Sequence, residues 1–198
     1  MLMSHDLPRG SLCTTDPVSS LIADLQFDLG EGPAIDAHTG GEPVLEPDLA
    51  DPQTPRWLAF TEPAVAAGAL AVHGFPVRIG AVRLGALSLF RDRAGPLTDD
   101  EYADAVAVAH VAAEAVLLFQ AGALPGLVAT ELDSGSDFHY DVHQASGMVA
   151  AQLDVSVGQA LVRLRAHAFA NGLPVRDIAQ QVVARELSFA VGEDLSEL

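Results

Sequence analysis

The 198-residue chain carries 27 acidic residues against 10 basic ones, a formal net charge of −17, and 49% of its residues are hydrophobic. This length suffices for one large or two small domains, and the apolar fraction can bury a core. A single cysteine excludes an internal disulfide and a cysteine-rich zinc site, so we expect a reducing, cytoplasmic location.

The first seventy residues predict short extended pieces and a few helices. Residues 9–15 favour a strand, and Pro17 begins a stretch whose apolar residues recur at helical spacing. Glycine and proline punctuate residues 30–51, which predicts a loop with short extended pieces. Residues 56–68 predict one or two short helices interrupted at Pro63. The start of the chain has no apolar stretch of signal-peptide length, so we do not expect export.

Residues 71–80 and 81–92 predict a β-hairpin. Both stretches are largely apolar, and Gly80 stands at the junction between them. Alternating or continuous apolar residues on both sides of a glycine are typical of two paired central strands.

Residues 98–120 predict a long helix that begins at Thr98 or Asp99. His110 and Glu114 interrupt its most apolar run, so we expect no membrane span. Two apolar stripes follow the helix, and one can cover a sheet while the other pairs with a second subunit; burial of both within one chain is the alternative. We assign subunit pairing to the stripe Tyr102, Val106, Ala109, Ala113 and Val116. The other stripe is Ala105, Val108, Ala112, Ala115 and Phe119.

The last third of the chain predicts a linker, three helices and a short tail. The linker covers residues 121–136, the helices 137–189, and the acidic tail 190–198. Ser156 with Gln159 forms a capping-box pattern, and Asn171-Gly172 is a helix stop. Pro174 falls in the first turn of the third helix, expected to reach residue 188. Short turns between such helices predict a compact bundle.

The text of residues 9–120 resembles a GAF domain. The resemblance is carried by LIADLQFDLGEGPAIDA, RWLAF and FPVRIGAVRLGALSLFRD, followed by the acidic-capped helix. It implies an antiparallel sheet flanked by helices, assigned here to residues 1–120, that senses a small molecule or a protein signal. The resemblance begins at Arg9, and it implies that the first helix and strand of the family are missing.

Residues 144–183 resemble an ANTAR domain. The stretch QASGMVAAQLDVSVGQALVRLRAHAFANGLPVRDIAQQVV follows the family pattern of three helices. The resemblance implies an α+β chain ending in an all-α RNA-binding bundle that acts in transcription antitermination on RNA hairpins. Two departures are Phe169, where the family often has methionine, and the absence of lysine from the whole chain.

We expect the RNA contacts to come from cationic and amide side chains on this bundle. Residues 1–136 hold 19 acidic and 6 basic residues, whereas residues 137–189 are close to neutral. Guanidinium groups bind phosphate bidentately and stack on unpaired bases. Pairing of these arginines with surface carboxylates is the alternative that the resemblance disfavours. The expected RNA-binding residues are Gln144, Arg163, Arg165, His167, Arg176 and Gln180.

No enzyme motif is present, and we expect neither catalysis, a metal nor a cofactor. His139 and His143 are four residues apart but lack a third ligand. Aromatic residues beside strands are usually core, although four residues could line a ligand cavity in the GAF-like part. These are Trp57, Phe60, His73 and Phe75.

Two other functions remain open at this point. The three helices could form a DNA-binding helix-turn-helix with helix 174–188 in the major groove. Its outward residues Asp177, Gln181 and Glu186 are poor phosphate partners. The chain could also be a protein-interaction or dimerisation module, and four arginines on one bundle predict weak RNA binding unless two copies act together.

Overall fold

The computed structural model describes residues 1–4, 7–52, 55–121 and 137–190. These form two compact units, Met1–Phe138 and His139–Leu198. The first unit combines a sheet with helices and the second is helical, so the chain has the predicted α+β class. Nearly all of the predicted linker, 122–136, and most of the tail, 191–198, lie outside the described residues.

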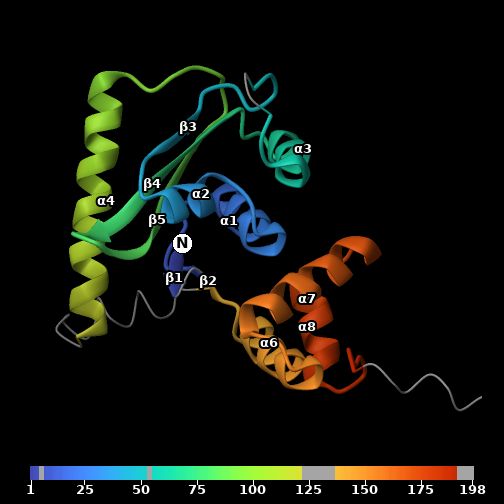
Figure 1. Cartoon of the computed structure of the whole chain (residues 1–198). Helices are drawn as coiled ribbons and strands as arrows, with labels where there is room; N and C mark the ends of the chain where they lie inside the picture. Colours follow the sequence, from blue (N-terminus) through green and yellow to red (C-terminus); the bar gives the residue numbers. More distant parts are fainter. Residues whose placement is uncertain (5–6, 53–54, 122–136, 191–198) are drawn as a thin grey trace, which may run out of the picture. The chain divides into compact units, whose positions relative to one another are not determined.

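A sheet of short and long strands organises the first unit (Figure 1). In the described residues it has six strands in the order β3-β4-β5-β1-β2-β6, and the paired neighbours are antiparallel. The strands are β1 (Leu2–Ser4), β2 (Leu7–Ser11), β3 (Val44–Glu46), β4 (Ala71–Ile79), β5 (Val82–Arg91) and β6 (Asp137–Phe138).

The predicted hairpin is confirmed as β4 and β5, the longest strands of the sheet. Its register runs from Ala71 opposite Arg91 to Ile79 opposite Val82. Gly80 supplies the left-handed conformation that the turn needs, with φ 57°. Pro76 lies opposite Ala86, where β5 directs its hydrogen-bonding groups away from β4 and toward Met1.

Three helices cover one face of this sheet: α1 (Pro17–Leu29), α2 (Pro33–Gly40) and α3 (Leu58–Ala66). The prediction of a loop over 30–51 was wrong where α2 forms. Pro33 preorganises its first turn, and the buried Gln26 side chain accepts the Ala34 N–H at 2.8 Å. Gly74 of β4 lacks a side chain where α2 packs, and a Cβ there would clash with the Pro33 carbonyl. Such long-range contacts are invisible to local sequence patterns.

Helix α3 continues through Pro63 as one helix rather than two. The Glu31 carboxylate accepts the N–H groups of Ala59 and Phe60 at 2.7 and 2.8 Å. Because these are donors of the first turn, a distant acidic side chain caps the helix.

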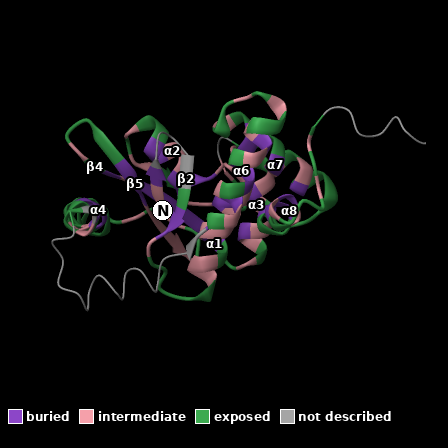
Figure 2. Ribbon diagram, turned by 90° about the horizontal axis from the view of Figure 1, so that it is seen from below, coloured by how far each residue is buried: buried purple, intermediate pink, exposed green. Residues whose placement is uncertain are grey.

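Helix α4 (Asp99–Gln120) covers the opposite face of the sheet, and the Thr98–Glu101 capping box fixes its start as predicted. Its buried residues include Ala105, Ala109 and Val116, which pack with Phe75 and Val77 of β4. Figure 2 shows the outer side of α4 exposed. The stripe that we assigned to subunit pairing is therefore split, because Ala109, Ala113 and Val116 face the sheet.

The second unit consists of α6 (Tyr140–Leu153), α7 (Val157–Asn171) and α8 (Val175–Val183). The Ser156–Gln159 capping box and the left-handed Gly172 stop are present as predicted. The third helix is shorter than predicted: Pro174 is its N-cap, and it ends before Arg185, which has φ 63°. The core residues are Val142, Ala145, Val149, Ala160, Leu161, Leu164, Ala168, Val175, Ile178, Ala179 and Val182.

His73 of β4 is fully buried, and neither ring nitrogen has a hydrogen-bond partner within the described part of the chain. Burial lowers its pKa from 6.5 to about 4, and the nearby Arg91 guanidinium acts in the same direction. The imidazole is therefore neutral in the folded protein at neutral pH.

We expect the folded state to lose stability as pH falls from 6.5 to about 4, because the unfolded chain then protonates His73 and the folded chain does not. Urea unfolding across this range should show a smaller loss for His73→Leu than for the parent protein. His110→Gln, at an exposed histidine, serves as the control and should keep the parental pH dependence. An unchanged dependence in His73→Leu would assign the effect to other groups.

Candidate nucleic-acid interface

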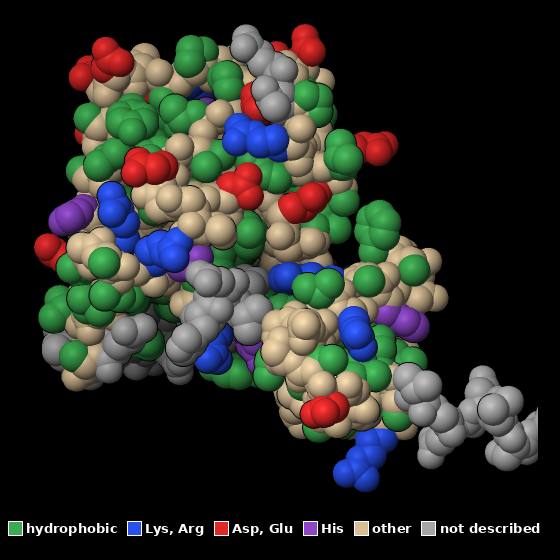
Figure 3. All heavy atoms as spheres, viewed as in Figure 1, with side chains coloured by type: hydrophobic (Ala, Val, Ile, Leu, Met, Phe, Trp, Pro, Cys, Tyr) green, Lys and Arg blue, Asp and Glu red, His purple; other side chains and the backbone are tan. Residues whose placement is uncertain are grey.

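The six predicted RNA-binding residues fall into two sets within the second unit. Gln144 lies on α6, and Arg176 and Gln180 lie on α8. Arg163, Arg165 and His167 all lie on α7. Figure 3 shows many acidic side chains over the visible face of the first unit. The segment 139–190, in contrast, holds four arginines and four acidic residues.

The first set is held by contacts between α6 and α8. Arg176 Nη2 lies 3.3 Å from His139 Nδ1, at the residue that precedes α6. One turn further along α8, Gln180 Nε2 donates to the Asp141 carboxylate at 3.3 Å. The structure thus places Arg176 against the start of α6.

Tyr140 is the first residue of α6, between His139 and Asp141 in the sequence, and it is 70% exposed. Residues four apart on a helix share a face, so Gln144 lies one turn above Tyr140, and it is exposed as well. We define the α6–α8 surface as Tyr140, Gln144, Arg176 and Gln180, with Asp141 beside it. It combines an aromatic face, two amides and one guanidinium.

The α7 set is less open than expected. Arg163 is exposed, whereas Arg165 and His167 are half-buried. The His167 ring makes an edge contact with Phe189 at a centroid distance of 5.4 Å. Phe189 is anchored by its own N–H, which donates to Gln152 Oε1 at 2.9 Å. Of the four cationic side chains predicted to contact RNA, Arg163 and Arg176 are therefore more open to solvent than Arg165 and His167.

Tyr140 and Asp141 were missed by sequence reasoning. Tyr140 could have been found, because it stands four residues before Gln144 at the start of an amphipathic helix. Asp141 could not, because its relevance depends on the packing of α8 against α6. Its carboxylate lowers the attraction of this surface for phosphate.

The four residues proposed for a ligand pocket do not line one cavity. Trp57 and Phe60 belong to the core between the sheet and α1 and α3, where their rings meet edge to face at 6.1 Å. Phe75 belongs to the core beneath α4 and contacts the Tyr102 ring at 5.6 Å. His73 is buried, so these residues act as core on opposite sides of the sheet.

His139 and His143 do not form part of a metal site in the described residues, where no group of three or more candidate ligands comes together. His139 is buried and contacts Arg176 instead.

Comparison with known proteins supports the resemblance of the second unit to an ANTAR domain. Residues 139–183 match the ANTAR domain, an RNA-binding domain of transcription antitermination regulators. A search of curated proteins found no match. One solved structure, described as a domain of a two-component sensor histidine kinase protein from Sinorhizobium meliloti 1021, is 21% identical with a TM-score of 0.38. The match covers 41% of this chain and 55% of that one, and so weak a likeness carries no argument. The GAF resemblance stays a prediction.

Substitutions on α7 should separate surface from core. Leu164 is fully buried, and Leu164→Ala should lower the unfolding free energy of the second unit by about 2 to 5 kcal/mol. The neighbouring Arg163 is exposed, and Arg163→Ala should change the unfolding free energy by less than about 0.5 kcal/mol. Chemical denaturation followed by circular dichroism would measure both. Equal losses would show that Arg163 has a structural partner.

Proposed function

We propose that this chain is a signal-responsive, RNA-binding regulator of transcription antitermination that binds RNA stem-loops through α6, α7 and α8. The ANTAR match at residues 139–183 is the observation that carries the proposal. The protein acts in the cytoplasm by binding rather than by catalysis, and the first unit receives a small-molecule or protein signal. The mixed sheet-and-helix architecture of that unit is compatible with such a role.

The α6–α8 surface is the proposed site for unpaired loop bases. The exposed Tyr140 ring can stack on a base, and the amides of Gln144 and Gln180 can bond to base edges. Arg176 lies against the residue that precedes α6, and its guanidinium can bind a phosphate or stack.

The α7 residues contribute phosphate contacts at the side of this site. Arg163 is exposed and can reach an RNA backbone, while Arg165 and His167 are half-buried. With four arginines and four acidic residues in segment 139–190, long-range attraction is weak. Recognition must then depend on loop shape more than on charge.

Two bundles acting together would compensate for this weakness, because linked sites gain avidity. Helix α4 offers the means of pairing. Val108, Val111, Ala115 and Leu118 recur at spacings of three and four residues, as in a coiled-coil seam. Val108, Val111 and Leu118 are 54%, 65% and 48% exposed. We call these four residues the α4 seam and propose that two chains pair through it.

The α4 seam differs from both stripes read from the sequence. Tyr102 and Val106 of the assigned stripe are exposed, but they flank the buried side of the helix rather than form its outer face. By length and composition alone, residues 99–119 could also cross a membrane. One side of α4 packs on the sheet, however, and Asp104, His110 and Glu114 are exposed on the helix. These two features favour pairing in water instead.

The RNA prediction compares single substitutions in the full chain. Arg176→Ala should weaken binding to an RNA stem-loop and reduce the salt slope by about 0.7, because one phosphate contact is lost. Asp141→Asn should strengthen binding, because it removes a carboxylate from the site without changing its shape. Filter binding across a salt series would measure both effects.

Arg185→Ala is the matched control, since Arg185 is exposed but lies beyond α8. If Arg185→Ala keeps the parental affinity for the RNA stem-loop while Arg176→Ala binds it more weakly, the proposed site is supported. Failure of the parent chain to prefer a stem-loop over a perfect RNA duplex would contradict RNA-loop binding. Preference for duplex DNA would favour the helix-turn-helix alternative, although exposed Asp177 and Glu186 beside α8 disfavour it.

The pairing prediction concerns the α4 seam. The double substitution Val111→Glu with Leu118→Glu should weaken self-association at least about tenfold, because it buries two carboxylates at the seam. Sedimentation velocity over a concentration series would measure this. Leu58→Glu with Val82→Glu introduces the same charges at other exposed apolar positions and should not affect association. A monomeric parent chain would contradict the pairing. If the seam substitutions abolish function but leave RNA binding intact, the interaction-module alternative is favoured.

A further inference from the structure

Among the described residues, backbone pairing along one side of β5 stops at Ala86. Strand β1 lies between β5 and β2, yet it spans three residues and meets β5 only where Leu2 lies opposite Gly85. Ala86 is the last residue of β5 that bonds in this direction: its N–H donates to the Met1 carbonyl at 2.9 Å, and its carbonyl accepts from the Met1 amino group at 2.7 Å.

Beyond Ala86, β5 continues for five residues to Arg91. Hydrogen-bonding direction alternates along a strand, so the backbone groups of Ser88 and Phe90 point the same way as those of Ala86. Leu87 and Leu89 bond toward β4 instead. Within the described residues, no strand pairs with β5 on the side of Ser88 and Phe90, and no backbone bond reaches them there.

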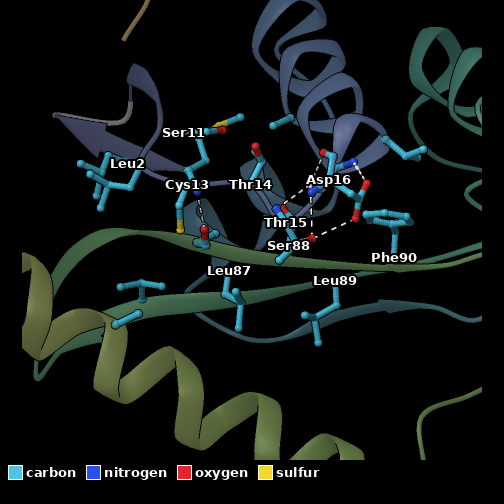
Figure 4. A pocket seen from close by; sticks show the side chains of 18 of the residues that line it. Leu2, Ser11, Cys13, Thr14, Thr15, Asp16, Leu87, Ser88, Leu89 and Phe90 are labelled. Atoms are coloured by element: carbon cyan, nitrogen blue, oxygen red, sulfur yellow. Dashed lines mark hydrogen bonds between the residues drawn. The ribbon is translucent and has the colours of Figure 1, made fainter. Parts of the chain in front are cut away.

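A cavity of about 780 Å³ lies along this edge (Figure 4). Its far wall is the segment from Ser11 to Asp16, which leads from β2 into α1. The cavity therefore lies in line with β1, on the side of β5 where the described residues provide no paired strand. From Ala86 to Arg91 the edge is about 17 Å long, enough for an extended segment of five residues.

The cavity is lined differently on the two faces of the sheet. In Figure 4, Leu87 and Leu89 point toward α4, whose Ala112 and Val116 complete an apolar wall. Ser88 and Phe90 point to the other face, toward α1. On that face, Gln26 Nε2 donates to Ser88 Oγ at 3.4 Å. The cavity lining also includes Thr15, Asp16, Val18, Ser19 and Ala23.

We propose that this cavity binds an extended peptide segment of a partner protein, which inserts as a strand antiparallel to β5 and in line with β1. Four backbone groups at strand spacing select a polypeptide main chain, as in other cases of strand addition. The apolar wall beneath α4 selects apolar side chains at alternate positions, and polar residues fit between them on the α1 side. This inference does not depend on RNA binding.

Directly opposed residues of antiparallel strands place their side chains on the same face. In the blocked peptide acetyl-Val-Thr-Val-Thr-Val-amide, the threonines would lie opposite Phe90 and Ser88, and the valines would face α4. N-methylation of both threonines removes the two donors that bond to β5 and leaves every side chain unchanged.

The test uses the full chain and amide hydrogen exchange measured by NMR. In the free protein, the amides of Ser88 and Phe90 should exchange faster than those of Leu87 and Leu89. The peptide should slow both, and the N-methylated peptide should bind at least about tenfold more weakly. Equal affinity of the two peptides would show side-chain docking only and overturn the proposal.

Two variants test the protein side of the same bonds. Ser88→Pro removes an N–H that points into the cavity and not toward β4, so the β4–β5 ladder remains. It should bind the peptide about fivefold to tenfold more weakly, whereas Ser88→Ala should bind like the parent. If Ser88→Pro fails to fold, the N-methylated peptide decides the question against the parent chain.

Two results with the free protein would also overturn the proposal. Slow exchange at Ser88 and Phe90 at low protein concentration would show that the edge is already paired. Slowing that increases with protein concentration, without peptide, would identify a second copy of this chain as the occupant.

Discussion

The β4–β5 ladder is the interaction on which the first unit depends. It is the only long strand pairing among the described residues, and helices pack on both of its faces. Pro76 has no N–H to donate, and it occupies a position of β4 that donates no hydrogen bond to β5. The ladder tolerates this proline because hydrogen-bonding direction alternates along each strand. The same alternation leaves Ser88 and Phe90 directed away from β4. Alternation of hydrogen-bonding direction thus accounts both for the pairing of β5 with β4 and for the backbone groups of Ser88 and Phe90 that point the other way.

The second unit is limited by electrostatics rather than by packing. Its core is closed by small and medium apolar residues, and the signals that bound α7, the Ser156–Gln159 capping box and Gly172, are local. The segment 139–190, however, holds as many acidic residues as arginines, and the first unit is strongly acidic. A protein with this balance cannot rely on long-range attraction to RNA. The proposed RNA binding must then draw its affinity from close contacts of fixed shape and from the proposed pairing of two chains.

Local patterns predicted most of the elements, because their causes are local. Thr98 and Ser156 cap helices through side chains three residues away, and Gly80 and Gly172 adopt conformations that suit glycine. Helix α2 was missed because a distant amide, that of Gln26, holds its first turn.

The site was harder to predict than the fold. Residue types indicated which side chains could contact RNA, and the structure brings Gln144, Arg176 and Gln180 onto neighbouring helices. Burial of Arg165 and His167 depends on how α7 packs and on Phe189, which sequence spacing does not encode. The cavity beside β5 was invisible for a similar reason, since it results from the register of β1 and not from any motif.

Helix α4 connects the two proposals made for the first unit. Ala112 and Val116 line the cavity beside β5, while the α4 seam lies on the outer side of the same helix. An apolar side chain inserted into the cavity would contact Ala112 and Val116 of this helix. If that contact changes the affinity of one chain for another, pairing must change the affinity for the peptide by the same factor. The two equilibria, measured together, would therefore show whether α4 can carry a signal from the cavity to the pairing of two chains.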